Sequence, residues 1–265
     1  MASKRILLLG GHGKISLLLT PRLVAHSWHV TSVIRDASQT DDILATVEGD
    51  GRSVDVLVSS LEDVKSKADA QQVIDRSKPD YVVWSAGAGG KGAPSRTQAV
   101  DRDSCIHFIR AAADTPSITK FLLISYPGSR RTKAPWWTEE EWSRTQEVNN
   151  GVLKPYYPAK LAADECLTAI ASRREDLHAI VLRPSRLTDE EAIGRISLGK
   201  TKASGKITRG DVAATAAELL NSEARGWLDL LEGDEAIADA VKRVIKDKVD
   251  CVEGEDVESM IQQYG

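Results

Sequence analysis

A short apolar segment followed by a glycine-rich turn and an amphipathic helix constrains the fold of this chain more than any other feature. Residues 6–9 are continuously apolar and end at Gly10-Gly11, which is typical of a strand buried on both faces of a sheet. Apolar residues at helical spacing follow over residues 13–26, and a second apolar strand is expected over residues 29–34. This order predicts two parallel strands joined by a crossover helix.

The same alternation continues through most of the chain. Further strands are expected over residues 53–58, 80–84, 120–125 and 178–182, and helices over residues 63–76, 96–113 and 159–173. Strands separated by helices predict an α/β fold with a Rossmann-like, doubly wound parallel sheet. The alternation fades after Pro184 without a change in composition that would mark a linker. We therefore expect one Rossmann-like domain over residues 1–265, of which about 184–265 form a small cap.

Composition excludes several classes of binding partner. The 35 Lys and Arg residues against 39 Asp and Glu residues give a net charge of −4 and a pI of about 5.8, which excludes the broad basic surface of a nucleic-acid-binding protein. The sequence has no apolar run long enough to span a membrane and no signal peptide, and its three cysteines are widely spaced. The five histidines are scattered, so no metal site is expected. These features predict a cytoplasmic protein that contacts neither nucleic acid nor membrane.

The turn Gly10-Gly11-His12-Gly13-Lys14-Ile15-Ser16 predicts a dinucleotide site. Glycines between a strand and a helix let the backbone approach a pyrophosphate, whose charge is met by the helix N-terminus. The expected cofactor contacts in this turn are Gly10, His12, Gly13, Lys14 and Ile15. The alternative is a tight turn that serves packing alone. Ser16 stands where a third glycine would ease the contact between helix and sheet.

The end of the second strand favours NADP(H) over NAD(H). An NAD site usually has an acidic residue there to hold the ribose hydroxyls, whereas this chain has Ile34 followed by Arg35. The planar guanidinium of Arg35 can pair with a 2′-phosphate. In the alternative interpretation, Arg35 is a solvated loop charge paired with Asp36.

Small residues follow the fourth expected strand. The loop Ser85-Ala86-Gly87-Ala88-Gly89-Gly90 would leave room for a ligand across the carboxyl ends of the strands, and Ser85, Ala86 and Gly87 are the expected cofactor contacts. A flexible glycine-rich loop is the alternative.

Tyr156 and Lys160 are candidate catalytic residues. They are four positions apart at the start of an expected helix, so they share one helix face. A cation beside a phenol favours the phenolate and is expected to lower the pKa of Tyr156 from about 10 toward the working pH.

Seven motifs occur in the order GGHGKIS, VIRD, SAGAGG, KFLLISY, YYPAKLAADE, LRPSRLTDE and ITRGDVA. In this order they resemble the atypical and extended branch of the short-chain dehydrogenase/reductase superfamily. Within that branch the chain is similar to the single-domain NAD(P)H-binding group, which is related to NAD-dependent epimerases and dehydratases. The resemblance spans about residues 5–250.

The resemblance implies roles for individual residues. Tyr156 would be the catalytic acid or base, Lys160 would bind the nicotinamide ribose, and Ser125 would hydrogen-bond the substrate oxygen. Relatives often have consecutive serines where this chain has Ser125-Tyr126-Pro127, so Ser129 is an alternative to Ser125.

Four further residues are assigned by the same resemblance. Pro184 would line the nicotinamide pocket. Ser60 and Leu61 would lie near the adenine, at a position where Asp is usual. Asp211 is expected to cap the N-terminus of a packed helix.

An aromatic loop is the most unusual local feature. Trp136, Trp137 and Trp142 lie within seven residues after the fifth expected strand. They could form a substrate lid, a contact with another subunit, or a hydrophobic plug at the edge of the domain. The following Glu139-Glu140-Glu141 is typical of the first turn of a helix.

These features together predict an NADP(H)-dependent oxidoreductase, a monomer or homodimer, that acts on a carbonyl or alcohol of a small-molecule substrate. The first alternative is an NAD-dependent epimerase or dehydratase of a sugar nucleotide, against which Arg35 and the short C-terminal segment both count. The second is a non-catalytic NADPH-binding regulator or redox sensor, against which the pair Tyr156 and Lys160 counts.

Overall fold

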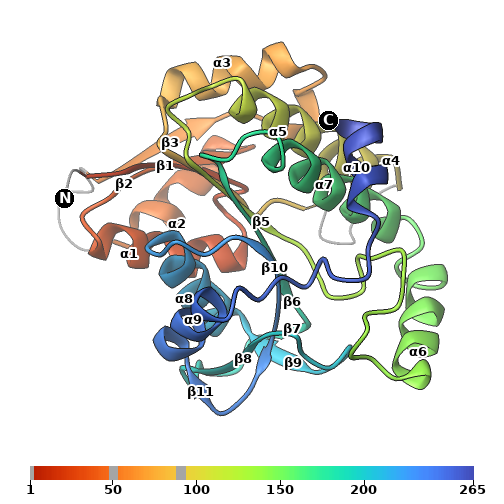
Figure 1. The fold of residues 1–265 in the computed structure, drawn as a ribbon. Coiled ribbons are helices and arrows are strands. Elements are labelled where there is room, and N and C mark those ends of the chain that lie inside the picture. Colours follow the sequence, from red (N-terminus) through yellow and green to blue (C-terminus); the bar gives the residue numbers. More distant parts are fainter. Residues whose placement is uncertain (1–2, 48–52, 88–93) are drawn as a thin grey trace.

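The computed structural model describes residues 3–47, 53–87 and 94–265, and a large twisted sheet runs through its centre (Figure 1). The strands are β1 (Arg5–Leu9), β2 (His29–Ile34), β3 (Val54–Val58), β4 (Tyr81–Trp84), β5 (Lys120–Ile124), β6 (His178–Pro184), β7 (Arg186–Thr188), β8 (Arg195–Gly199), β9 (Lys206–Thr208), β10 (Gly226–Glu232) and β11 (Glu235–Ala236). Nine of these described strands form the main sheet, and β7 and β9 pair separately.

The strand order confirms the predicted doubly wound sheet. The order across the main sheet is β11-β8-β10-β6-β5-β4-β1-β2-β3. The seven strands from β10 to β3 are parallel, whereas β8 pairs antiparallel with both of its neighbours, β10 and β11. From β1 the chain adds β2 and β3 on one side and β4 onward on the other. In sheets of this kind, ligands bind at the carboxyl ends of the two strands on either side of such a reversal, which are β1 and β4 here.

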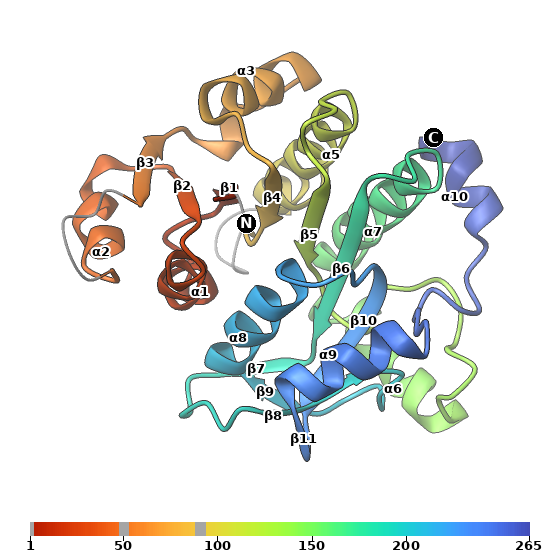
Figure 2. The same cartoon turned by 60° about the vertical axis from the view of Figure 1, so that its left-hand side comes forward.

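Helices cover both faces of the sheet (Figure 2). They are α1 (Lys14–Ala25), α2 (Thr40–Leu44), α3 (Lys67–Ser77), α4 (Pro94–Thr97), α5 (Cys105–Ala113), α6 (Glu139–Asn150), α7 (Tyr156–Ala171), α8 (Arg209–Leu220), α9 (Ile237–Lys246) and α10 (Val257–Tyr264). Residues of α1, α8 and α9 share one buried cluster, and residues of α3, α5, α7 and α10 share the other. Successive strand residues such as Leu7 and Leu8 point into opposite clusters, as the pleat of a strand requires.

Three helices differ from the predicted bounds. The helix expected from residue 63 begins at Lys67, because the Ser66 side chain accepts a hydrogen bond from the Asp69 N–H and caps it. The helix expected over residues 96–113 contains a π-helical turn at Gln98–Ser104, between α4 and α5. The helix expected from residue 159 begins at Tyr156, because Pro158 is tolerated within a first turn.

The part of the chain after Pro184 joins the main sheet. β10 pairs with β6, and β8 and β11 extend the edge beyond it. The covering of a substrate by this part stays a prediction. Across the described ranges, no helix combines the length and the apolar character needed to cross a bilayer.

Candidate functional site

The glycine-rich turn packs tightly against β2 and the segment after β4, which flank β1 on its two sides. Gly10 has a φ of +84°, and a Cβ on it would lie 2.6 Å from the Cα of Ala86 after β4. A Cβ on Gly11 would lie 1.9 Å from the Oγ of Ser32 in β2. Both positions therefore require glycine, because any larger residue would displace the backbone or a buried side chain.

The N-terminus of α1 fits a pyrophosphate. Gly13 is its N-cap, and in this fully described helix neither a side-chain cap nor an acidic first-turn residue satisfies the free N–H groups. Gly13 and Lys14 are exposed, so an anion can reach these groups and the positive end of the helix dipole. Ile15 and Ser16 are buried against the sheet, and Ser16 fits where a third glycine is usual. Contact of Ile15 with a cofactor would therefore involve its backbone.

The two charged side chains of the turn have partners within the protein. His12 Nε2 lies 2.7 Å from Asp42 Oδ2 in α2. Lys14 Nζ lies 2.6 Å from Asp189 Oδ2, and Arg209 binds the other oxygen of that carboxylate at 2.7 Å. A cofactor phosphate contacting either residue would compete with these carboxylates.

Arg35 is exposed directly after β2. The adjacent Asp36 caps the short 3₁₀ helix Ala37–Gln39 and accepts a hydrogen bond from the Ser38 N–H at 2.9 Å. That bond lowers the pKa of Asp36, with a smaller contribution from the charge of Arg35. Within the described part of the chain, Arg35 makes no ion pair. Its side chain therefore lies exposed at the carboxyl end of β2.

The other predicted cofactor contacts also lie at carboxyl ends of strands. Ser60 follows β3 and caps the 3₁₀ helix Leu61–Asp63 through its hydroxyl, and Leu61 packs into the core beside α3 and α5. Ser85, Ala86 and Gly87 follow β4, and Pro184 ends β6. Of the predicted loop, Ala88, Gly89 and Gly90 lie outside the described residues.

Tyr156 and Lys160 lie on one face of α7, as predicted. Lys160 is 1% exposed, and its Nζ donates a hydrogen bond to the Ile124 carbonyl at the end of β5, at 2.6 Å. Burial raises the pKa of Tyr156, and Lys160 opposes this increase. The expected net lowering of the Tyr156 pKa is therefore wrong for the protein alone, because desolvation of the phenolate outweighs the attraction of the lysine.

The two candidate serines converge on one buried carboxylate. Ser125 Oγ donates a hydrogen bond to Asp164 Oδ2 at 2.6 Å, and Asp164 lies one turn after Lys160 in α7. Ser129 is fully buried and lies close enough to the same carboxylate to lower its pKa. Asp164 is absent from the sequence-based site. The signal for it is an acidic residue on the helix face that already carries Tyr156 and Lys160.

Tyr126 lies beside the predicted catalytic tyrosine. The ring centroids of Tyr126 and Tyr156 are 5.5 Å apart. The Tyr126 hydroxyl donates to Asn149 Oδ1 at 2.9 Å, and Asn149 Nδ2 in turn donates to the Gly128 carbonyl. Sequence reasoning did not select Tyr126, although it directly follows the candidate Ser125.

Asp101 is a second missed residue. It lies on the π-helical turn, is almost fully buried, and raises the pKa of both Lys160 and Tyr156 through its charge. An acidic residue on an otherwise apolar helix face, between Val100 and Cys105, is the sequence signal that could have identified it.

A buried ion pair lies behind the candidate catalytic residues. Arg183 in β6 and Asp229 in β10 are both fully buried, and Arg183 also donates to the Pro127 carbonyl. The guanidinium carbon lies 4.3 Å from the ring centroid of Trp227. A charged residue in each of two apolar strands was the signal that sequence reasoning missed.

The aromatic loop closes an edge of the domain. The Nε1 groups of Trp136 and Trp137 both donate to the Thr201 carbonyl, at 2.8 and 2.9 Å. Their rings lie 5.4 and 5.3 Å from the guanidinium of Arg130. Of the three predicted alternatives, these contacts within the chain match the hydrophobic plug.

Residues 251–255 form a strap across the same loop. Arg130 donates to the carbonyls of Cys251 and Glu253. The Glu255 carboxylate accepts hydrogen bonds from the backbone N–H groups of Arg131 and Thr132. The strap therefore fixes the segment that carries Ser129.

Two local predictions after β5 have different outcomes. Glu139-Glu140-Glu141 forms the first turn of α6, and Thr138 and Glu141 make a capping box, as expected for a helix start. Asp211 is not the N-cap of α8. Thr208 is the N-cap, and Asp211 lies three residues later, where it accepts hydrogen bonds from the N–H groups of Ile193 and Gly194.

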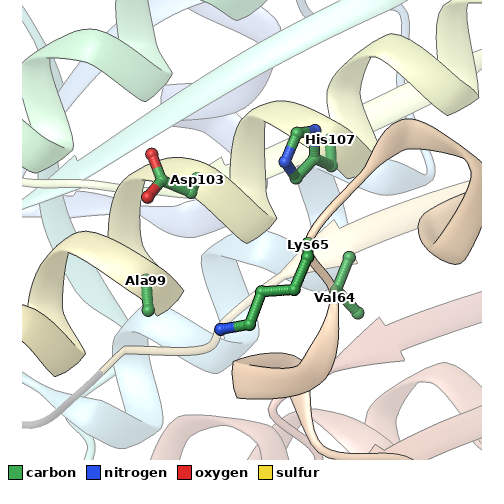
Figure 3. A pocket seen from close by; sticks show the side chains of 5 residues that line it. All are labelled: Val64, Lys65, Ala99, Asp103 and His107. Carbon is green, nitrogen blue, oxygen red and sulfur yellow. The ribbon is translucent and has the colours of Figure 1, made fainter.

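A cavity of about 240 Å³ lies beside the start of α3 (Figure 3). It is lined by Val64, Lys65, Ala99, Asp103 and His107. Figure 3 shows Asp103 and His107 on the helical segment that faces Lys65. None of the predicted site residues lines this cavity.

One known protein family and two relatives match most of this sequence. The family described as NAD(P)H-binding matches residues 10–223. The UPF0659 protein C216.03 of Schizosaccharomyces pombe is 32% identical over 238 residues, which cover 88% of this chain and 91% of that protein. The "uncharacterized sugar epimerase YhfK" of Bacillus subtilis is 29% identical over 245 residues, which cover 91% of this chain and 100% of that protein.

A solved structure shares the fold. The crystal structure of the oxidoreductase ylbE from Lactococcus lactis matches with a TM-score of 0.68 and 23% identity, over 91% of this chain and 96% of that one. The family match spans most of the chain and includes the glycine-rich turn, Tyr156 and Lys160. The chain therefore belongs to the NAD(P)H-binding family.

Proposed function

We propose that the protein is an NADP(H)-dependent oxidoreductase that acts on a carbonyl or alcohol of a small organic molecule. The observation that carries the proposal is the pairing of Tyr156 and Lys160 on one face of α7, beside the carboxyl end of β5. A phenol and a buried ammonium in this arrangement can move a proton to or from a substrate oxygen.

The chain supplies a separate surface for each part of the cofactor. The N-terminus of α1 would hold the pyrophosphate, and Arg35 would pair with the 2′-phosphate. Lys160 would bind the nicotinamide ribose, next to Pro184. When bound, the nicotinamide supplies or accepts the hydride.

The electrostatics of Tyr156 favour one direction of proton transfer. Burial raises the pKa of Tyr156, so its hydroxyl is protonated at neutral pH. A protonated phenol can donate its hydrogen to a substrate oxygen, which is the proton transfer that carbonyl reduction needs. Lys160 opposes the shift by stabilising the phenolate that remains after the transfer.

Substitution of the phenol tests the proposal. Turnover of NADPH with a panel of aldehydes and ketones is expected to fall at least about 100-fold in Tyr156→Phe, while the Kd for NADPH stays within about twofold. Tyr157→Phe is the matched control, because the Tyr157 hydroxyl binds the Arg130 carbonyl instead. Full turnover in Tyr156→Phe would contradict the role of Tyr156, whereas NADPH binding without any turnover in the unmodified protein would favour a non-catalytic NADPH-binding regulator.

The second candidate is an NAD-dependent epimerase or dehydratase of a sugar nucleotide. The Bacillus subtilis relative that is described as a sugar epimerase favours it. That activity would consume no net cofactor and would prefer NAD. Tighter binding of NADH than of NADPH, with conversion of a sugar nucleotide at constant nicotinamide absorbance, would establish it instead.

A further inference from the structure

Asp164 is a fully buried carboxyl directly behind the candidate catalytic residues. It lies one turn after Lys160 and two turns after Tyr156 on the same face of α7. Its Oδ2 accepts the 2.6 Å hydrogen bond from Ser125. Its Oδ1 accepts no hydrogen bond of normal geometry from any residue that the structure describes. The Ser125 hydroxyl therefore points into the protein toward this carboxyl.

A hydroxyl has a single hydrogen, and an ionised carboxylate can only accept. While Asp164 is ionised, Ser125 gives its hydrogen to Asp164 and has only lone pairs to offer elsewhere. When Asp164 is protonated, the carboxyl can donate to Ser125, and the serine hydrogen is free to turn toward another acceptor.

We propose that Asp164 is a positioning residue whose charge decides whether Ser125 offers its hydrogen or its lone pairs to the substrate oxygen. The inference rests on the proposed function, because it takes Ser125 as the residue that contacts the substrate. An ionised Asp164 leaves Ser125 only lone pairs, to which a bound alcohol can donate; because the alcohol has a single hydrogen, this pose directs it away from Tyr156. A protonated Asp164 suits a carbonyl, whose oxygen accepts from Ser125.

The surroundings of Asp164 allow both forms near neutral pH. Burial raises the pKa of Asp164 to about 6, and Lys160, Arg183 and the two serine hydroxyls oppose the increase. The other titratable groups that interact with Asp164 are Cys105 at the start of α5, Tyr126 after β5, Tyr156 on α7 and Asp229 in β10. Both the ionised and the protonated form of Asp164 are accessible, because the charges of Lys160 and Arg183 compensate for the desolvation of the carboxylate.

The coupling between Asp164 and Ser125 is measurable without turnover. In protein labelled with ¹³C-aspartate, the side-chain carbon of Asp164 is assigned by its absence in Asp164→Asn. Ser125→Ala removes the donor to the ionised form, so the pKa of Asp164 is expected to rise by about one unit. Ser172→Ala, at the far end of α7, is the matched control and is expected to cause no shift.

Kinetics then test the consequence for the substrate. In the unmodified protein, the rate of carbonyl reduction is expected to fall about fivefold or more as rising pH ionises Asp164. This descending limb of the pH–rate profile is expected to disappear in Ser125→Ala. Ser125→Ala alone carries this test if Asp164→Asn fails to fold.

Three outcomes separate the inference from the proposed function. A shifted Asp164 titration together with loss of the limb supports the inference. An unshifted titration, or a limb that persists in Ser125→Ala, overturns it. If the protein binds NADPH but converts no carbonyl or alcohol, the proposed function fails, and the Asp164 titration in Ser125→Ala then decides whether the two residues are coupled.

Discussion

Arg183 and Asp229 face each other on the neighbouring parallel strands β6 and β10, and Arg183 Nε lies 2.9 Å from Asp229 Oδ1. Both side chains are fully buried, and the two atoms are in ion-pair contact without an aligned N–H···O bond. A buried pair of this kind adds little net stability, because removing two charges from water is unfavourable. The pair links β6 to β10, the strand beside it in the sheet.

Removal of one partner leaves the other as an unpaired buried charge. We expect Asp229→Ala to lower the free energy of unfolding by about 3–5 kcal/mol, measured by urea denaturation. Glu140→Ala breaks the exposed pair of Glu140 and Arg144 and should change it by less than about 1 kcal/mol. Equal effects of the two substitutions would contradict the buried pairing.

Stability should also depend on pH through the same buried carboxyls. Burial raises the pKa of both Asp164 and Asp229 to about 6, above the value in the unfolded chain. Between about pH 4 and pH 6 the folded state holds more protons than the unfolded state, so the free energy of unfolding falls as pH rises. Each carboxyl is expected to contribute a decrease of about 3 kcal/mol across this window.

The contribution of Asp229 is isolated by difference. The free energy of unfolding of the unmodified protein minus that of Asp229→Asn should decrease from about pH 4 to pH 6 and level off above it. A difference that is constant over this range would show that Asp229 titrates with its ordinary pKa.

Gly11 should be irreplaceable for cofactor binding. A Cβ there would lie 1.9 Å from the Oγ and 3.0 Å from the Cβ of Ser32, so Gly11→Ala must displace the turn or β2. Titration with NADPH, followed by nicotinamide fluorescence, is expected to show affinity reduced by about tenfold or more. Adding Ser32→Gly removes both clashing atoms and should restore part of the affinity. No rescue by the second substitution would point to a different cause.

Arg35 should set the preference between the two nicotinamide cofactors. Arg35→Ala removes the cation at the end of β2, so the Kd for NADPH should rise about tenfold or more while that for NADH stays within about twofold. The matched control is Arg22→Ala, an exposed arginine in the last turn of α1. An equal loss of affinity for both cofactors would contradict a contact with the 2′-phosphate.

The sequence predicted the part of the fold in which each strand is a short apolar run. β1, β2, β4 and β5 lie within one residue of their expected bounds, because such runs encode strands buried on both faces. The strand β8 and its neighbour β10 were not predicted. β10 carries Asp229, and that charge interrupts the apolar pattern on which the prediction depended.

The candidate site, too, was predicted from the sequence only in part. Spacing alone placed Tyr156 and Lys160 together, because the two residues share one helix. Ser125 and Asp164 are 39 positions apart, and only the packing of α7 against the end of β5 brings them together. Asp101 depends on the π-helical turn, which shifts the register of a helix and leaves no simple periodic signal.

The strap over residues 251–255 has a consequence for the order of events during synthesis. Arg130 and its partner carbonyls are 121 and 123 positions apart. A ribosome adding about 5–20 residues per second makes the loop after β5 roughly 6–24 s before the segment that satisfies it. A nascent chain can thus assemble the strands around the glycine-rich turn first, while the guanidinium of Arg130 stays hydrated. The segment that carries Ser129 and Arg130 can reach its final shape only after residue 255 has left the exit tunnel.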